Sequence, residues 1–317
     1  MLTVDPLISV LMPVYNGMPY LPLAVQSILK QTFTDFEFII VNDCSTDNSL
    51  QYLEVIKNTD NRIRIVKNEK NIGLTQSLNK GLEIASGKYI ARLDQDDIAY
   101  PDRFEIQVAH LEKNLDIGLL GSCCDIIDEN GIVKNSKMKE LNDLRIRWKM
   151  LSKNPFVHST IMFRKQIIRE YALKYESKFG EDYNLWGKMV NCSKARIIPE
   201  KLIAYRFHAN NFTHKNNHFQ VEALKTFSYT NFNQYIGFMS LNDWSTFQPV
   251  LKGNLTAKTI GESTFRDNYL ILLKRFNQAN YVSRNDVFFS ERMKQLRSRI
   301  RWYRFYSMKT LYFWLTV

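Results

Sequence analysis

The first hundred residues alternate between short apolar runs and amphipathic segments. Apolar runs of strand length cover residues 7–12, 36–41, 62–66 and 89–93. Segments with apolar residues at helical spacing cover 20–31, 49–57 and 74–85. This alternation predicts a parallel sheet with helices on both faces. We therefore expect an α/β protein with a Rossmann-like, mostly parallel sheet.

The pattern loosens beyond residue 101. Helices are expected at 102–114, 141–151 and from 180 onward, with strands at 117–122, 159–163, 195–199 and 202–206 and a hairpin-type turn at 128–131. After about residue 218 the alternation ends, and the chain becomes helical, aromatic and basic. We expect one domain over 1–217, with halves of about 1–100 and 101–217, and a helical C-terminal region over 218–317.

Polar clusters follow three of the predicted strands. They comprise residues 13–16, 42–47 and 94–97, and parallel strands should bring them to one rim of the sheet. Asp94, Asp96 and Asp97 would repel one another unless a cation lies between them. Their hard oxygens suit Mg²⁺ or Mn²⁺ on a phosphate. The alternative is that all three only cap the next helix.

Four other side chains have a functional and a structural interpretation. Asp43 could accept an N–H from a base edge or cap a helix. Asp182, at a predicted helix start, could be a general base or only a cap. Arg206 could face a phosphate or form a surface ion pair, and His208 could be a ligand or structural. No GxGxxG follows the first strand and no GxxxxGK[ST] occurs, which counts against a dinucleotide fold or a P-loop.

The net charge of +11 favours anionic partners. Residues 291–310 carry seven basic residues and the single acid Glu291. The segment 291–317 mixes these cations with aromatic residues, so it could lie at an anionic membrane surface. A solvated basic helix and a homodimer contact are the alternatives, and nucleic acid is not expected as a partner.

The four cysteines form no CxxC pair. The sequence shows no secretory signal, and no apolar run is long enough to span a membrane. We expect free thiols and a cytoplasmic protein, either free or peripheral at the inner face of the cell membrane.

The motifs, in their order along the chain, resemble the nucleotide-sugar-dependent glycosyltransferases of family 2, which have the GT-A fold. The resemblance covers about residues 7–211. Asn42 departs from it, since the family usually has an acid there. The matching segments are 10–16, 31–33, 36–47, 71–74, 79–82, 85–90, 94–97 with 101–103, 180–183 with 185–186, and 205–208.

The resemblance implies an inverting transfer from a nucleotide-diphosphate sugar, expected to be a UDP-sugar, to a hydroxyl of a glycan or lipid-linked oligosaccharide in surface polysaccharide synthesis. The transferred group would be a hexose or an N-acetylhexosamine. Residues 1–100 would bind the nucleotide sugar and 101–217 the acceptor. The competing hypotheses are a metal-dependent phosphohydrolase and a glycan- or nucleotide-binding protein without turnover.

The resemblance also implies roles for individual residues. Asp182 would be the general base, and Asp43 would contact the base of the nucleotide. Mn²⁺ or Mg²⁺ would be held by Asp94, Asp96 and His208. The role of Asp97 stays open between ligand and support. The expected nucleotide-sugar-binding residues are Pro13, Tyr15, Asn16, Asp43, Asn71, Arg92, Asp94, Gln95 and Arg206.

Overall fold

The computed structural model describes residues 5–134, 136, 138–209, 211, 217–236, 244, 262–281 and 286–299. The chain divides into two compact units. One comprises Met1–Asp143 and Phe156–Ala223, and the other Leu144–Pro155 and Leu224–Val317. Residues 144–155 thus group with the C-terminal part, which the hydrophobic pattern did not indicate.

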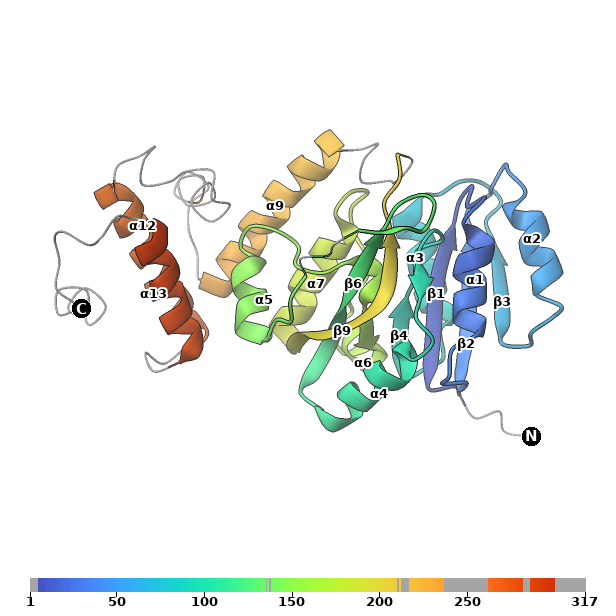
Figure 1. Ribbon diagram of the computed structural model, residues 1–317, viewed down its shortest axis with the longest axis horizontal. Coiled ribbons are helices and arrows are strands. Elements are labelled where there is room, and N and C mark those ends of the chain that lie inside the picture. The colour runs from blue at the N-terminus through green and yellow to red at the C-terminus, as the bar shows by residue number, and fades with distance from the viewer. Residues whose placement is uncertain are drawn as a thin grey trace. The chain divides into compact units, whose positions relative to one another are not determined.

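The N-terminal half of the first unit is built from regular strand–helix repeats (Figure 1). Strands β3, β2, β1 and β4 lie side by side in that order and run parallel. The four strands and the three helices that sequence periodicity predicted are confirmed. Their bounds are β1 Ile8–Val14, α1 Leu21–Leu29, β2 Phe36–Asn42, α2 Ser49–Ile56, β3 Ile63–Lys67, α3 Leu74–Ile84 and β4 Tyr89–Arg92.

The rest of the first unit extends the same sheet with mixed directions. The full order is β3-β2-β1-β4-β8-β6-β9-β5, with β7 paired to β6. Strand β8 is antiparallel to β4 and β6, whereas β6 and β9 are parallel. The elements are β5 Ile98–Ala99, α4 Arg103–Lys113, β6 Ile117–Ile127, β7 Val133–Lys134, the 3-10 turn η1 His158–Thr160, β8 Met162–Arg164, α6 Lys165–Glu170, α7 Glu181–Cys192 and β9 Lys194–Arg206. Helix α5 Asp143–Lys149 begins at the end of the first unit and otherwise belongs to the second.

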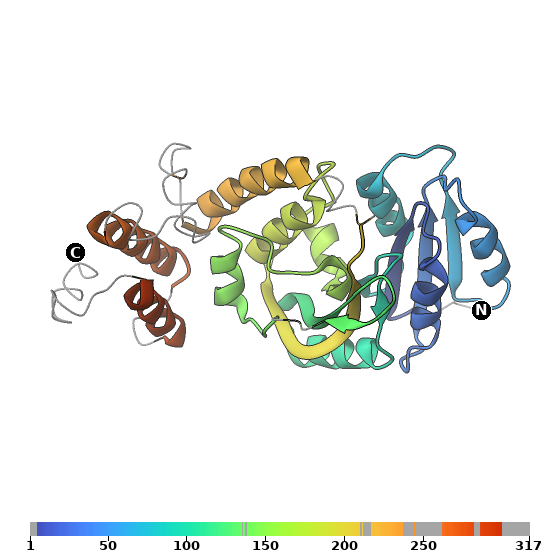
Figure 2. The same ribbon diagram turned by 45° about the horizontal axis from the view of Figure 1, so that its top comes forward.

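Two strand predictions in this region need correction. The strands expected at 195–199 and 202–206 are one continuous strand, β9, which curves strongly (Figure 2). Its register against β6 shifts at Ser122/Cys123 and Cys123/Cys124, so an irregularity bends the strand without ending it. The strand expected at 159–163 is wrong in its first part, because residues 158–160 form η1 and only 162–164 pair as β8.

The central strands are buried on both faces. All seven residues of β1 and of β2 are buried. One face packs on α1 through residues such as Val25 and Ile28, which belong to the same apolar cluster as Val10 and Phe38. On α3, Gly81 approaches Leu11 so closely that a Cβ would lie 2.0 Å from Leu11 Cδ1. This double cover leaves the carboxyl ends of the strands as the place for polar side chains.

The second unit is held by an aromatic cluster around Trp148. Its indole packs against the rings of Tyr269, Phe276 and Phe288 at centroid distances of 5.8, 5.2 and 5.8 Å. Arg145 forms an ion pair with Glu291. These contacts explain why residues 144–155 group with the C-terminal helices, which are α9 Asn217–Ile236, α12 Glu262–Ala279 and α13 Val287–Arg299.

None of the described helices is both long and apolar enough to cross a membrane. The segment 291–317, expected at a membrane surface or in a dimer, lies mostly outside the described residues.

Candidate active site

The ends of β1, β2 and β4 meet at one edge of the sheet, as their polar residues predicted. Val14 pairs with Asn42, and the Asp43 N–H donates to the Val14 carbonyl at 2.8 Å. The Leu93 N–H donates to the Leu11 carbonyl at 3.2 Å, which brings the acidic segment 94–97 beside the other two strand ends. One rim therefore carries Asp43, Asp94 and Asp96.

Asp94 is held from two sides. The guanidinium of Arg92, which is 0% exposed, forms an ion pair with its carboxylate. The Ser159 hydroxyl lies 3.0 Å from Asp94 Oδ2 and accepts the Asp94 N–H at 3.0 Å. Burial alone would raise the pKa of Asp94, but Arg92 and the Ser159 hydrogen bond hold that pKa below its usual value. Asp94 is thus an ionised carboxylate in a set orientation.

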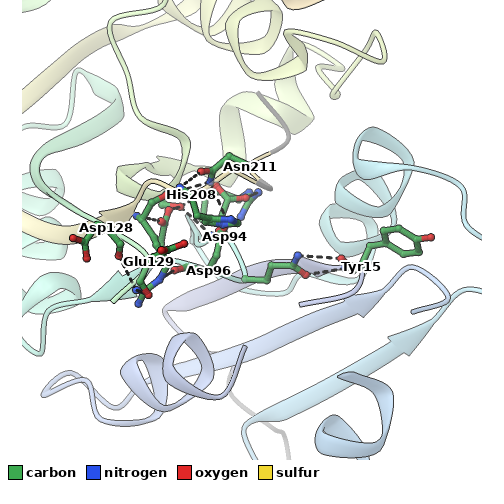
Figure 3. Close-up of polar contacts among 12 residues, drawn as sticks. Tyr15, Asp94, Asp96, Asp128, Glu129, His208 and Asn211 are labelled. Atoms are coloured by element: carbon green, nitrogen blue, oxygen red, sulfur yellow. Dashed lines mark hydrogen bonds and ion pairs between the residues drawn. The ribbon is translucent and has the colours of Figure 1, made fainter. Parts of the chain in front are cut away.

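Asp96 forms a second polar cluster with the segment after β9 (Figure 3). Its Oδ2 lies 2.9 Å from His208 Nε2 and 3.3 Å from Asn211 Nδ2. His208, expected as a metal ligand, therefore contacts one of the expected carboxylate ligands, and Asn211 was not expected there. The His208 ring also packs on Tyr20, with centroids 4.9 Å apart.

Asp94 and Asp96 fit a site for a divalent cation whose remaining ligands are phosphate and water oxygens. Among the described residues, no group of three or more His, Cys, Asp and Glu side chains could hold a metal ion by itself. Mg²⁺ usually keeps only one or two carboxylates and takes its other ligands from phosphate and water. Asp94 and Asp96, two residues apart at a strand end, supply that number.

Asp97 is the buried member of the acidic segment 94–97. It is 0% exposed, and its Oδ1 accepts the Arg206 N–H at 2.8 Å. Burial, with the charges of Asp96 and Asp94, raises the pKa of Asp97 well above its usual value. Its Oδ2 contacts the Ser159 hydroxyl, which has one proton for two carboxyl groups. A protonated Asp97 satisfies all three groups, because it donates to Ser159, and Ser159 donates to Asp94.

Arg206 stabilises the rim from inside. It is 2% exposed, and its Nε donates to the Asp96 carbonyl at 2.9 Å. Its Nη1 lies 3.1 Å from both the Asp128 and the Glu129 carbonyl oxygens. The guanidinium also lies 4.6 Å from the Tyr20 ring centroid. This geometry makes Arg206 a positioning residue, and a direct contact with the donor stays a prediction.

The loop after β1 is joined to its neighbours by side chains predicted to bind the donor. Gln95 accepts the Tyr15 N–H at 2.8 Å and donates to the Tyr15 carbonyl at 3.0 Å. Asn16, at φ 50°, accepts the Thr46 N–H at 2.8 Å. Tyr15 is 45% exposed, and its ring points away from the acidic cluster (Figure 3). Pro13 lies in β1 opposite Val41.

Asp43 has a structural role at the start of α3. It is 3% exposed and accepts the N–H groups of Ile72 at 2.9 Å and Gly73 at 2.8 Å. The Asn68 amide donates to it at 2.8 Å. Asp43 thereby orders the turn that contains Asn71, which is exposed. The predicted contact between Asp43 and the nucleotide base stays a prediction.

Asp182 lies in the first turn of α7, where the left-handed Gly180 (φ 65°) begins the helix. Its Oδ1 accepts the Tyr183 N–H at 2.6 Å. Burial raises the pKa of Asp182 to about 6; the Tyr183 hydrogen bond and Arg92 lower it in part, and Asp94 raises it further. Burial and Asp182 also raise the pKa of Glu181. A carboxylate with a pKa near neutrality is suited to general base catalysis.

Sequence reasoning missed Ser159, the residue that joins Asp94 and Asp97. Its signal was weak, a polar residue just before a short apolar run. Its hydrogen-bond partners lie 65 and 62 positions away in the chain.

A family model and several known glycosyltransferases match this chain. The family described as Glycosyl transferase family 2 matches residues 9–172. An uncharacterized glycosyltransferase of Haemophilus influenzae is 35% identical over 250 residues, which cover 75% of this chain and 76% of that protein. The O-antigen biosynthesis glycosyltransferase WbnJ of Escherichia coli is 35% identical over 213 residues, covering 64% of this chain and 80% of WbnJ.

The fold is also that of solved glycosyltransferases. The crystal structure of S. aureus TarS 1–349 in complex with UDP is similar with a TM-score of 0.59 and 16% identity, over 92% of this chain and 88% of that one. The family match and the similar relatives show that the chain belongs to the family 2 glycosyltransferases, and the similar solved structure shows that it has their GT-A fold.

Proposed function

We propose that this glycosyltransferase moves a hexose or N-acetylhexosamine from a UDP-sugar to a hydroxyl of a glycan or lipid-linked oligosaccharide in surface polysaccharide synthesis. The observation that carries the proposal is one rim with two carboxylates for a metal–diphosphate group, Asp94 and Asp96, together with a raised-pKa acid, Asp182, on α7.

The relatives support the substrate classes. WfgD of Escherichia coli, named a UDP-Glc:alpha-D-GlcNAc-diphosphoundecaprenol beta-1,3-glucosyltransferase, is 29% identical over 64% of this chain and 82% of its own length. Amylovoran biosynthesis glycosyltransferase AmsE of Erwinia amylovora is 32% identical over 205 residues, covering 62% of this chain and 75% of AmsE. TarS has also been solved in complex with UDP-GlcNAc, with a TM-score of 0.57 over 95% of this chain and 93% of that one.

Asp94 and Asp96 would hold the divalent cation that family 2 enzymes generally use, here Mg²⁺ or Mn²⁺, with His208 as a further ligand or as the support of Asp96. When bound, the cation neutralises charge on the departing diphosphate. Tyr15 and Asn71 are exposed and would line the nucleotide site, whereas the buried Arg92 sets the charge of Asp94.

Asp182 would accept the proton of the acceptor hydroxyl. The acceptor oxygen then attacks the anomeric carbon opposite the leaving diphosphate, so the configuration inverts and no covalent enzyme intermediate is needed. At neutral pH a base with a pKa of about 6 is mostly ionised, so it can accept a proton. Its raised pKa also makes it a stronger base than an ordinary aspartate.

The test is a panel of UDP-sugars with Mn²⁺ and candidate glycan acceptors. We expect UDP release that depends on the acceptor. Release of inorganic phosphate would indicate the phosphohydrolase hypothesis, which the family match does not favour. Tight UDP binding without release in any combination would indicate a binding protein.

A lipid-linked acceptor would bring the enzyme to the inner face of the cell membrane. We propose a cytoplasmic, peripheral location in which the basic segment 291–317 contacts anionic lipid. A homodimer contact by the same segment is the competing proposal.

A further inference from the structure

Three aromatic side chains from separate segments pack on one another in the first unit. His158 lies in η1, Tyr175 between α6 and α7, and Trp186 in α7. The ring centroids are 5.7 Å apart for His158–Tyr175, 5.7 Å for His158–Trp186 and 6.0 Å for Tyr175–Trp186. Trp186 is 0% and Tyr175 2% exposed. Because each ring contacts the other two, the three segments are fixed relative to one another.

This aromatic triangle connects the two halves of the proposed chemistry. Trp186 lies one helical turn after Asp182 on α7, so the indole and the proposed base share a helix face. His158 directly precedes Ser159, whose hydroxyl holds Asp94. The triangle therefore links the helix that carries the proposed base to η1, the turn whose Ser159 holds the carboxylate expected to bind the metal.

Asn79 of α3 holds the triangle through the backbone of Tyr175. Its Nδ2 donates to the Tyr175 carbonyl at 2.9 Å, and its Oδ1 accepts the Tyr175 N–H at 3.0 Å. The side-chain amide thus pairs with both backbone groups of one residue. A second bond from the same helix, Thr75 Oγ1 to the Ser177 carbonyl at 2.6 Å, supports the same segment.

The side chain of Tyr175 completes the connection to η1. Its hydroxyl lies 3.1 Å from His158 Nε2. Burial, with the charge of Arg92, lowers the pKa of His158 to about 3, and burial raises the pKa of Tyr175 above its usual range. Both side chains are neutral near neutral pH, so one N–H or O–H and one lone pair are available for this bond.

We propose that Asn79, Tyr175 and His158 are positioning residues that hold helix α7, and with it Asp182, at a set distance from Asp94. The role in transfer rests on the proposed function of Asp182, but the contact network does not. Transfer requires the acceptor oxygen and the anomeric carbon to be aligned closely, and small displacements cost rate. None of the three is among the side chains expected to contact the nucleotide, so donor affinity should not depend on them.

The structural part is tested by hydrogen–deuterium exchange on Asn79→Ala and Tyr175→Phe. We expect amides in residues 173–182 to exchange about tenfold faster or more in both variants, because a local opening loses its hydrogen bonds. Asn114→Ala is the matched control, since it removes a side-chain bond to the His110 carbonyl at the end of α4. Unchanged exchange in 173–182, or an equal rise throughout the first unit in both variants, would overturn the proposal.

The catalytic part is tested with UDP binding and with the donor–acceptor pair from the panel. For both variants we expect the UDP Kd and the donor KM to stay within about twofold, while kcat per UDP-binding site falls about 10- to 100-fold. A fall in kcat together with an equal loss of UDP affinity would contradict a positioning role. If no pair supports transfer, the proposed function fails, whereas the exchange result still decides whether the network holds α7.

Discussion

The Ser159 hydroxyl lies 3.0 Å from Asp94 Oδ2 and also accepts the Asp94 backbone N–H at 3.0 Å. One side chain from η1 thus sets both the backbone and the carboxylate orientation of an expected metal-binding residue. The same hydroxyl contacts the buried Asp97.

Ser159→Ala should therefore weaken metal-dependent transfer while the protein stays folded. Asp94 would lose an acceptor and a donor, and Asp97 would keep only the Arg206 N–H, so we expect about 10- to 100-fold lower kcat/KM, corresponding to one or two hydrogen bonds to charged groups. The measurement is a Mn²⁺ titration of transfer. Ser193→Ala, which removes a bond to the Met189 carbonyl at the far end of α7, is the control. An unchanged Mn²⁺ dependence would refute this role of Ser159.

Asp182→Asn should abolish most transfer and leave donor affinity intact. The amide keeps the shape of the side chain but cannot take the acceptor proton, and loss of a general base typically costs about 10²- to 10⁴-fold in rate. Calorimetry with UDP, beside transfer kinetics, measures both effects. Asp116→Asn, which makes the same acid-to-amide change at an exposed residue paired with Lys194 at the start of β9, should have no effect. Transfer at the rate of the unmodified enzyme would exclude Asp182 as the base.

The rate of transfer should fall with acid below about pH 6. The base must be ionised, and the buried surroundings raise the pKa of Asp182 to about 6 from an ordinary 3.8. Activity should therefore decrease as pH falls through the raised pKa of Asp182, and not only below pH 4. The measurement is kcat/KM against pH at saturating Mn²⁺. An acidic limb at the ordinary pKa of an aspartate would show that the base is solvated.

Burial of the ionised Asp182 carboxylate should also lower the free energy of unfolding at neutral pH. Because its pKa is raised in the folded state, folding binds a proton between about pH 4 and pH 6, and stability falls as pH rises through that window. Asp182→Asn should therefore raise the melting temperature at pH 7.5, with little change at pH 4. Thermal melts at the two pH values measure this difference. A lower melting temperature for the variant at pH 7.5 would mean that the carboxylate stabilises the fold.

Removal of residues 300–317 should release the protein from anionic liposomes. The segment carries Arg301, Arg304 and Lys309 among aromatic residues, and each cation near an anionic surface contributes about 1 kcal/mol. Co-sedimentation with phosphatidylserine vesicles tests it, with neutral vesicles as the control. Unchanged sedimentation, with a change of oligomeric state instead, would favour the dimer contact.

Much of the first unit could be predicted because its strands and helices are marked by the pattern of apolar residues within each short segment of the sequence. The fully apolar β1 and β2 indicate strands covered on both faces, and the acids after β4 mark the rim. The curved β9 could not be predicted as one strand, because pairing with the long β6 carries it through Pro199. Propensity alone would end a strand there.

By itself, the sequence determined the order of strands and helices, the rim at which they end and the family motifs at that rim. Only the tertiary structure decided what each acid does. Asp94 and Asp97 are three positions apart and chemically identical, yet Arg92 holds the pKa of Asp94 below its usual value, whereas burial raises the pKa of Asp97 well above it. Ser159 and Asn79 likewise act on partners 65 and 96 positions away. Hydrogen bonding and desolvation depend on neighbours in space, which local patterns do not encode.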